Sequence, residues 1–300
     1  MLRTARLCIG LAAFAAGPAV AAPFNLDQHG LTGSWYDPAT PGQGVEIEVY
    51  PDFDDPTQGI LFAGWFTYDA TAAGGQRWYA MTGLATPTGA ADLHIYSAYG
   101  GNFAAPPIVA PTAPLGTATL TFDDCNDGLL AYRFDDGRSG MIPLARLTPN
   151  VTCTPTGDDV HAVTDTYGLS GNWYDPNTGG QGLMFDFAPS LGGVFAAWYT
   201  FVQNGQSIGD GASQRWYTLQ ATGFVPGVSA LAGIPIVDTT GGVFDSPVPT
   251  HSVQVGSVDL AFQNCNALTV TYRFDRGENA ALSGVLQLQR AGPVPAICNL

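Results

Sequence analysis

The sequence contains no lysine, and its ten basic residues, all arginine, face 25 acidic residues, which gives a formal net charge of −15 at pH 7. Nucleic acids and acidic membrane surfaces are bound through basic patches that release counterions, and so few cations do not form such a patch. Only 12% of the chain is charged, while 46% is hydrophobic, which is enough to build packed cores. The composition therefore excludes nucleic acid as a partner and predicts a folded, acidic protein.

The sequence also lacks an apolar run of the roughly 20 residues that a bilayer-spanning helix needs. The longest run follows Arg3 and Arg6, covers residues 7–16, and is succeeded by the small residues 19–21. This order is typical of a cleavable secretory signal. We therefore expect residues 1–21 to be removed on export, and a secreted or periplasmic mature protein without a transmembrane segment.

Cysteine is sparse. Five occur in the chain, and Cys8 lies inside the predicted signal. An even number of cysteines in an exported protein indicates disulfides, and four of them allow three connectivities. The repeat described below favours one bridge per unit, Cys125 with Cys153 and Cys265 with Cys298.

Motifs of catalysis and cofactor binding are missing as well. The chain contains neither G-x-S-x-G nor a phosphate-cradling glycine loop, and no histidine has a His or Cys partner at metal-ligand spacing. Glu48 and Asp186 occupy equivalent places in the two units, and a carboxylate pair can hydrolyse glycosides, so an enzyme is left open. We nevertheless expect a non-enzymatic protein without cofactor or metal.

An internal repeat organises what is present. The segment GSWYDPATPGQG at Gly33 returns as GNWYDPNTGGQG at Gly171, and CNDGLLAYRFD at Cys125 returns as CNALTVTYRFD at Cys265. Further matches between these keep the same order, which indicates duplication. We expect repeat one over residues 31–153, a linker over 154–168 and repeat two over 169–298.

Apolar and polar residues alternate within each repeat, as in residues 45–49 and 118–122, and no helical stripe is found. Counting alternating segments between turn residues gives eight strands per repeat, joined by connections of hairpin length. This predicts an all-β protein made of two tandem antiparallel eight-stranded up-and-down β-barrels, an arrangement that leaves no sheet edge open. A β-sandwich of jelly-roll or Greek-key type is the alternative.

The start of each repeat is similar to known families. LTGSWYDPATPGQGVEIEVYP, from Leu31, resembles the first strands of avidin-like barrels, and its G-x-W is similar to that of lipocalins, so both comparisons favour a calycin-like barrel. The lipocalin resemblance implies that Trp35 packs against Arg146, and Trp173 against Arg290, at one barrel end. The G-x-W-Y-x-P start, central W-Y-T-Y and late cysteine also resemble a repeat domain of exported bacterial proteins of unknown function. None of these resemblances implies a ligand. The biotin-binding polar side chains and the helix that follows the barrel in lipocalins are missing, and the repeat domain implies a compartment but no activity.

The candidate binding residues gather at the barrel end that receives the first, third, fifth and seventh turns. Aromatic faces beside a few polar groups suit sugars or small amphiphiles, and an acidic chain repels anions. We therefore predict a binding module for a small neutral molecule or glycan, held at the barrel mouth that carries the repeated GQG turn. The predicted ligand-binding residues are Asp37, Gln43, Trp65, Arg77, Trp78 and Tyr79, with Asp175, Gln181, Trp198, Arg215, Trp216 and Tyr217 in repeat two.

A second hypothesis treats these aromatics as core. Residues 61–68 are apolar on both faces of one predicted strand, so one face must leave the barrel and bury a contact between the repeats or a protein partner. This predicts a structural or protein-interaction role in the envelope or extracellular space. The two hypotheses differ at the mouth, because binding requires a pocket of about 300 Å³ lined by Trp78, Gln43 and Arg77 or their copies, whereas a structural role predicts a plugged mouth.

Overall fold

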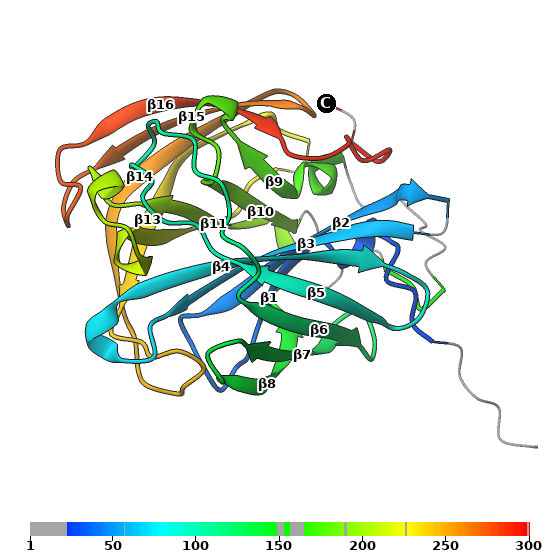
Figure 1. Cartoon of the computed structure of the whole chain (residues 1–300). Coiled ribbons are helices and arrows are strands. Elements are labelled where there is room, and N and C mark those ends of the chain that lie inside the picture. Colours follow the sequence, from blue (N-terminus) through cyan, green and yellow to red (C-terminus); the bar gives the residue numbers. More distant parts are fainter. Residues whose placement is uncertain are drawn as a thin grey trace, which may run out of the picture.

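The computed structural model describes residues 23–56, 58–148, 153–156, 165–188, 191–225, 227–298 and 300; the predicted signal and residues 157–164 of the predicted linker lie outside them. The described residues form two closed antiparallel barrels of eight strands each, one after the other along the chain (Figure 1). The prediction of two tandem eight-stranded β-barrels is therefore confirmed. Within the described residues, no helix has the length and apolar character needed to span a bilayer.

Barrel one is a meander in which each strand pairs with the next and the last returns to the first, Arg146 lying opposite Trp35. Its strands are β1 (Gly33–Tyr36), β2 (Gly44–Asp55), β3 (Gln58–Tyr68), β4 (Gln76–Ala85), β5 (Ala90–Tyr96), β6 (Gly116–Phe122), β7 (Asp127–Phe134) and β8 (Ser139–Arg146). Two short 3-10 helices, η1 (His29–Leu31) and η2 (Ala72–Gly74), precede β1 and β4.

Barrel two repeats this order, with Arg290 opposite Trp173 at its closure. Its strands are β9 (Gly171–Tyr174), β10 (Gly182–Ala188), β11 (Gly193–Phe201), β12 (Gln214–Thr222), β13 (Ala230–Thr240), β14 (His251–Asn264), β15 (Ala267–Phe274) and β16 (Ser283–Arg290). The 3-10 helices η3 (Asp165–Leu169), η4 (Pro176–Thr178), η6 (Gly205–Ser207) and η7 (Gly211–Ser213) occupy connections.

An arginine and a tryptophan close one end of each barrel. The Arg146 guanidinium carbon lies 5.2 Å from the centre of the Trp35 ring, and that of Arg290 lies 4.8 Å from the Trp173 ring. Both distances fall within the range of cation-π attraction, which is worth about 2 kcal/mol when the pair is desolvated. The two Trp–Arg contacts are as predicted.

Two disulfides fasten the same ends. Cys125 bonds to Cys153 and Cys265 to Cys298, which is the predicted connectivity. Each joins the turn before the seventh strand of its barrel to the segment after the eighth, across 28 and 33 residues. Loops of this length are stabilised by about 3–4 kcal/mol. Two such bridges indicate an oxidising compartment outside the cytoplasm.

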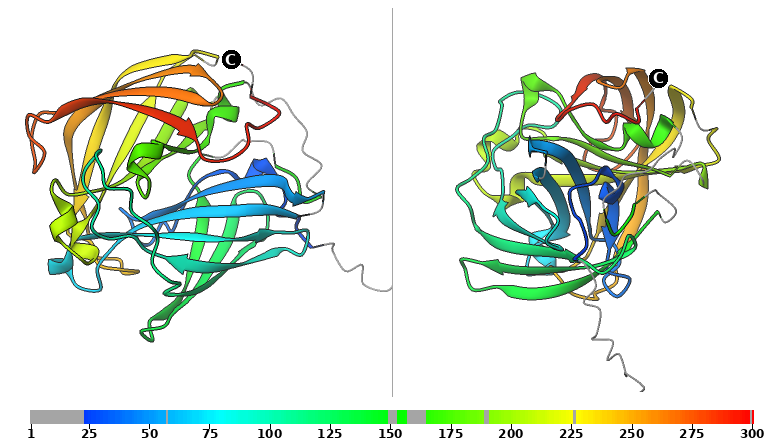
Figure 2. Two further views of the ribbon diagram at one scale, coloured as in Figure 1. Left: turned by 45° about the horizontal axis from the view of Figure 1, so that its top comes forward. Right: turned by 90° about the vertical axis from the view of Figure 1, so that its right-hand side faces the viewer.

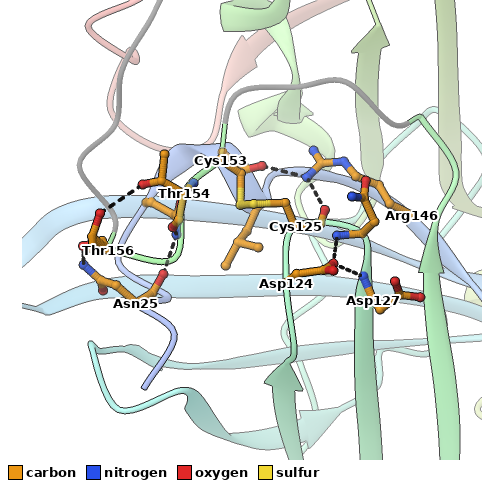
Figure 3. Close-up of a disulfide and its surroundings, with 12 residues drawn as sticks. Asn25, Asp124, Cys125, Asp127, Arg146, Cys153, Thr154 and Thr156 are labelled. Carbon is orange, nitrogen blue, oxygen red and sulfur yellow. Dashed lines mark hydrogen bonds between the residues drawn. A yellow bond between two sulfur atoms is a disulfide. The ribbon is translucent and has the colours of Figure 1, made fainter. Parts of the chain in front are cut away.

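The N-terminal segment lies beside the first disulfide (Figure 3). The Asn25 amide donates a hydrogen bond from its side chain to the Thr156 carbonyl at 3.1 Å, and Gln28 exchanges two bonds with the Thr154 backbone. The chain before β1 and the chain after β8 are therefore held together at the closed end of barrel one.

The two barrels lie side by side (Figure 2), with β4 against β12 and with β1 and β2 against β9 and β10. Side chains from the outer faces of β3 and β11 pack in the same contact. Alternation explains why: Trp65 points into barrel one, whereas its neighbour Phe66 points out of it, toward barrel two. The second apolar face predicted for β3 thus buries the contact between the repeats. We call the resulting cluster the inter-barrel core; it consists of Phe66, Tyr68, Trp78, Ala98, Met184, Ala197, Tyr199, Phe201 and Trp216.

Equivalent residues of the two repeats exchange equivalent bonds across this core. The Gln76 side chain donates to the Trp216 carbonyl at 2.9 Å and accepts from the Trp216 amide at 3.1 Å. Gln214 does the same with Trp78, at 2.8 and 3.3 Å. The barrels are therefore related by an approximate two-fold axis, and the repeated QRWY segment supplies both halves of the contact.

Candidate functional site

Both barrel mouths are occupied by a phenylalanine from the other barrel. Phe244, in the connection between β13 and β14, lies 5.1 Å from Trp65 and 5.5 Å from Tyr132 of barrel one, measured between ring centres. Phe103, in the connection between β5 and β6, lies 5.2 Å from Trp198 in barrel two. We call residues 100–105 and 241–246 the plug loops, because each fills the mouth of the opposite barrel.

The repeated GQG turn holds these plug loops. The Gln43 side chain accepts from the Thr67 hydroxyl at 2.7 Å and donates to the carbonyl of Val243 at 3.3 Å. Its copy Gln181 accepts from the Thr200 hydroxyl at 2.8 Å and from the Ala104 amide at 3.0 Å, and donates to the Asn102 carbonyl at 3.0 Å. A structural requirement therefore accounts for the identity of this turn in the two repeats.

A glycine in each plug loop permits the crossing. A Cβ atom on Gly101 would lie 2.1 Å from the Phe201 ring, and one on Gly242 would lie 2.1 Å from the Tyr68 ring. Any larger residue would push the loop away from the opposite barrel.

The predicted binding residues do not converge on one open site. Trp65, Tyr79, Trp198 and Tyr217 pack inside the barrels beneath the plugs, whereas Trp78 and Trp216 lie in the inter-barrel core. Arg77 and Arg215 form ion pairs with Asp69 and Glu278, at 2.9 and 2.7 Å. Asp37 and Asp175 each accept a backbone N–H two residues ahead, which caps the turn that follows the strand. Ligand binding by this set in a barrel mouth stays a prediction, and Phe244 and Phe103 occupy the space that it requires.

A groove between the barrels brings some of these residues together. It has a volume of about 340 Å³ and receives walls from β3, β4 and the β5–β6 connection of barrel one, and from β9, β10 and β11 of barrel two. Among the predicted residues it contains Trp78, Tyr79 and Gln181. The other lining residues are Phe62, Gly64, Ala80, Ser97, Ala98, Val109, Pro111, Asn172, Tyr174, Gly180, Gly182, Met184, Tyr199 and Ala291.

Sequence reasoning missed most of this lining. Tyr199 is the copy of Phe66, so the two-faced apolar pattern of the third strand marks both as outward-facing. Asn172 and Tyr174 flank the inward Trp173 and therefore face outward as well. The alternation of the sequence could have identified these side chains as outward-facing. It could not have predicted that repeat one supplies the opposite wall of the groove.

A larger cavity of about 510 Å³ lies at the closed end of the barrels, between Asp27, Asp52 and the segment from Pro293 to Ile297. Burial, and the like charges of Asp52 and Asp55, raise the pKa of Asp27 above its usual range.

The equivalent carboxylates Glu48 and Asp186 are buried between the barrels. Glu48 forms an ion pair with Arg290 at 3.2 Å and accepts a hydrogen bond from the backbone N–H of Asn172 at 2.6 Å. It therefore binds two strands of the opposite repeat. Asp186 accepts a hydrogen bond from the backbone N–H of Ser34 at 2.9 Å, which is the equivalent bond in the other direction between the repeats. Both side chains are enclosed, and their geometry serves the contact between barrels.

A third carboxylate lies beside Asp186. Glu46 is 1% exposed and accepts the Ser34 hydroxyl at 3.0 Å, while one oxygen of each carboxylate has no hydrogen-bond partner among the described residues. Burial, reinforced by the charge of Asp186, raises the pKa of Glu46 well above its usual range, and burial raises that of Asp186. The repeat-two copy of Glu46 is Met184, so this carboxylate pair occurs on one side of the axis.

Glu46→Gln is expected to stabilise the protein by about 1–2 kcal/mol at pH 7 and by less at pH 5. A carboxyl whose pKa is raised by folding contributes stability below its unfolded pKa and loses that contribution as the pH rises through the folded pKa. Glutamine does not titrate and can donate to Asp186. Urea unfolding between pH 4.5 and 8 measures the difference in the free energy of unfolding between the variant and the wild type, and the exposed Glu278→Gln is the control. A difference that is the same at all pH values would contradict the expectation.

Comparisons with known proteins do not assign a family to the chain. A scan against models of protein families gave no match, and a search of curated proteins gave none that is significant. The functional conclusion therefore depends on the fold and on the groove between the barrels.

Proposed function

We propose that the protein is an exported, non-enzymatic binding protein whose ligand is a small uncharged molecule held in the groove between its barrels. The groove carries this proposal: about 340 Å³ is within the range of small-molecule sites, and Trp78 and Tyr199 stand in its wall. The two disulfides and the signal-like residues 1–21 support secretion or a periplasmic location.

The lining favours a neutral ligand. Among the described residues that form the walls, none carries a charge, and most are aromatic, aliphatic or glycine. An ion entering such a groove would lose its hydration without gaining an opposite charge, which is costly. A neutral ring can instead cover the aromatic faces and displace water from them.

A structural or protein-interaction role is the second candidate, and the plugged mouths favour it. Phe103 and Phe244 fill the spaces in which calycin-like barrels would hold a ligand, and the outer face of β3 is buried within the chain. On this alternative the groove is an incidental gap between two fused barrels in an envelope or extracellular scaffold.

A blocking variant separates the two candidates. Ala80 lies on the same outward face of β4 as Trp78 and lines the groove, so Ala80→Trp should fill part of it. We expect uncharged ring compounds found by a thermal-shift screen of the mature protein to bind Ala80→Trp at least about tenfold more weakly. The matched control is Ala131→Trp on the outer face of β7, which should bind as the wild type does.

Binding that survives in Ala80→Trp would place the site elsewhere. A broad screen without any hit would favour the structural candidate.

A further inference from the structure

One polar side chain in the groove is left without an internal partner. The side-chain amide of Asn172 lines the groove and makes no hydrogen bond to another described residue; the bond to Glu48 comes from the backbone N–H of Asn172. The other groove amide, Gln181, is fully used by the plug loop and Thr200, and the Ser97 hydroxyl accepts from Gln214 at 3.0 Å. Asn172 therefore supplies the free donor and acceptor of an otherwise largely apolar groove.

The backbone of Asn172 is fixed on both sides. Its N–H donates to Glu48 at 2.6 Å, and its carbonyl accepts the Ala291 amide at 2.9 Å. Glu48 is itself held by Arg290 at 3.2 Å. The amide is thus presented from a rigid strand, and a preorganised group loses little entropy when it binds.

The equivalent residue of repeat one cannot do the same. Ser34 occupies the matching position in β1, but its hydroxyl donates to Glu46 at 3.0 Å and its N–H to Asp186 at 2.9 Å. The free amide is therefore a feature of one side of the molecule.

We infer that Asn172 determines the specificity of the groove, and that the ligand is a mainly apolar ring compound with one carbonyl-bearing or amide-like edge. This rests on the proposed binding function and narrows it. A polyhydroxylated sugar would bury several hydroxyl groups against largely apolar walls with few free polar groups, and each unpaired group costs about 1–3 kcal/mol. The choice is thus a functionalised ring rather than a glycan.

Matched probes test this on the mature full-length protein. Benzamide carries the expected edge on a flat ring, toluene lacks the edge, benzoate and benzamidine carry charges of opposite sign, and methyl β-glucopyranoside represents a sugar. Dissociation constants come from chemical-shift titrations. We expect benzamide to bind about fivefold to tenfold more tightly than each of the other four, the factor that one neutral hydrogen bond provides.

Asn172→Leu keeps the side-chain size and removes the amide. It should weaken benzamide binding about fivefold to tenfold and leave toluene binding unchanged or tighter. Asn126→Leu is the control, because Asn126 is exposed in the turn between β6 and β7, away from the groove lining.

The outcomes separate the two levels of the proposal. Benzamide binding that is blocked by Ala80→Trp but unchanged in Asn172→Leu would overturn the role of Asn172 and leave the groove as the site. A preference for the glucoside would overturn the ligand class. Failure of every probe to bind, or binding that Ala80→Trp does not affect, would overturn the proposed function itself.

Discussion

Replacing Phe103 and Phe244 by alanine is expected to lower the free energy of unfolding by about 3 kcal/mol for each substitution. Both rings are buried, and each packs among aromatic residues of the opposite barrel. Removing a ring leaves a cavity that the rigid barrel cannot close. Since the two rings share no partner, the double substitution should cost about the sum, which urea unfolding monitored by tryptophan fluorescence measures.

Phe53→Ala provides the control, because that ring is 51% exposed and a loss below about 1 kcal/mol is expected. The variants also report on the mouths. If each plug substitution lowers the free energy of unfolding as little as the control does, the two rings are not tightly packed in the mouths. The hypothesis of a ligand site at the barrel mouths would then be favoured again.

Arg290→Met is expected to destabilise the protein by about 3–5 kcal/mol at pH 8, because it leaves Glu48 buried without its cation. Burial raises the pKa of Glu48 to about 7 even though Arg290 opposes the shift. Without the arginine the pKa must rise further. A carboxyl whose pKa is raised in the folded state lowers the stability of the protein as the pH rises. At pH 5 the variant should therefore recover much of the free energy of unfolding that it loses at pH 8.

Glu48→Gln combined with Arg290→Met removes the stranded charge and should regain a large part of the loss at pH 8. Arg215→Met is the control, because the pair with Glu278 is partly exposed and such pairs are worth less than about 1 kcal/mol. A loss in Arg290→Met that is the same at pH 5 and pH 8 would show that the arginine acts through its carbonyl bonds and the Trp173 ring instead.

The barrels could be predicted from sequence because their signals are local or repeated. Alternation in segments such as residues 45–49 reflects one face in the core and one outside, and turn residues mark where strands end. The disulfide pairing followed from the repeat, which favours one bridge per unit, Cys125 with Cys153 and Cys265 with Cys298. The Trp35–Arg146 contact followed from a resemblance, and its geometry agrees.

The plugs and the groove could not be predicted in the same way, because they depend on how one repeat packs against the other. Gln43 was interpreted as a ligand group on the grounds that its turn is kept in both repeats, and the same conservation follows from its bonds to a plug loop. One signal was available: GGNF at Gly100 and GGVF at Gly241 are copies in connections of otherwise different length. Reading them as equivalent would have pointed to a shared structural task, but not to which mouth each fills.

The reciprocal exchange of plug loops has a consequence for how such a protein can change. Contacts in which each half supplies the same residues to the other are those of a symmetric homodimer, where every mutation is expressed twice. In a fused chain one half can mutate alone. The equivalent of Glu46 in repeat two is Met184, and that of Ser34 is Asn172. The two halves have therefore diverged at the contact while the arrangement of the barrels is kept. Covalent fusion thus lets a single asymmetric surface evolve on an interface that two separate identical subunits would be obliged to duplicate.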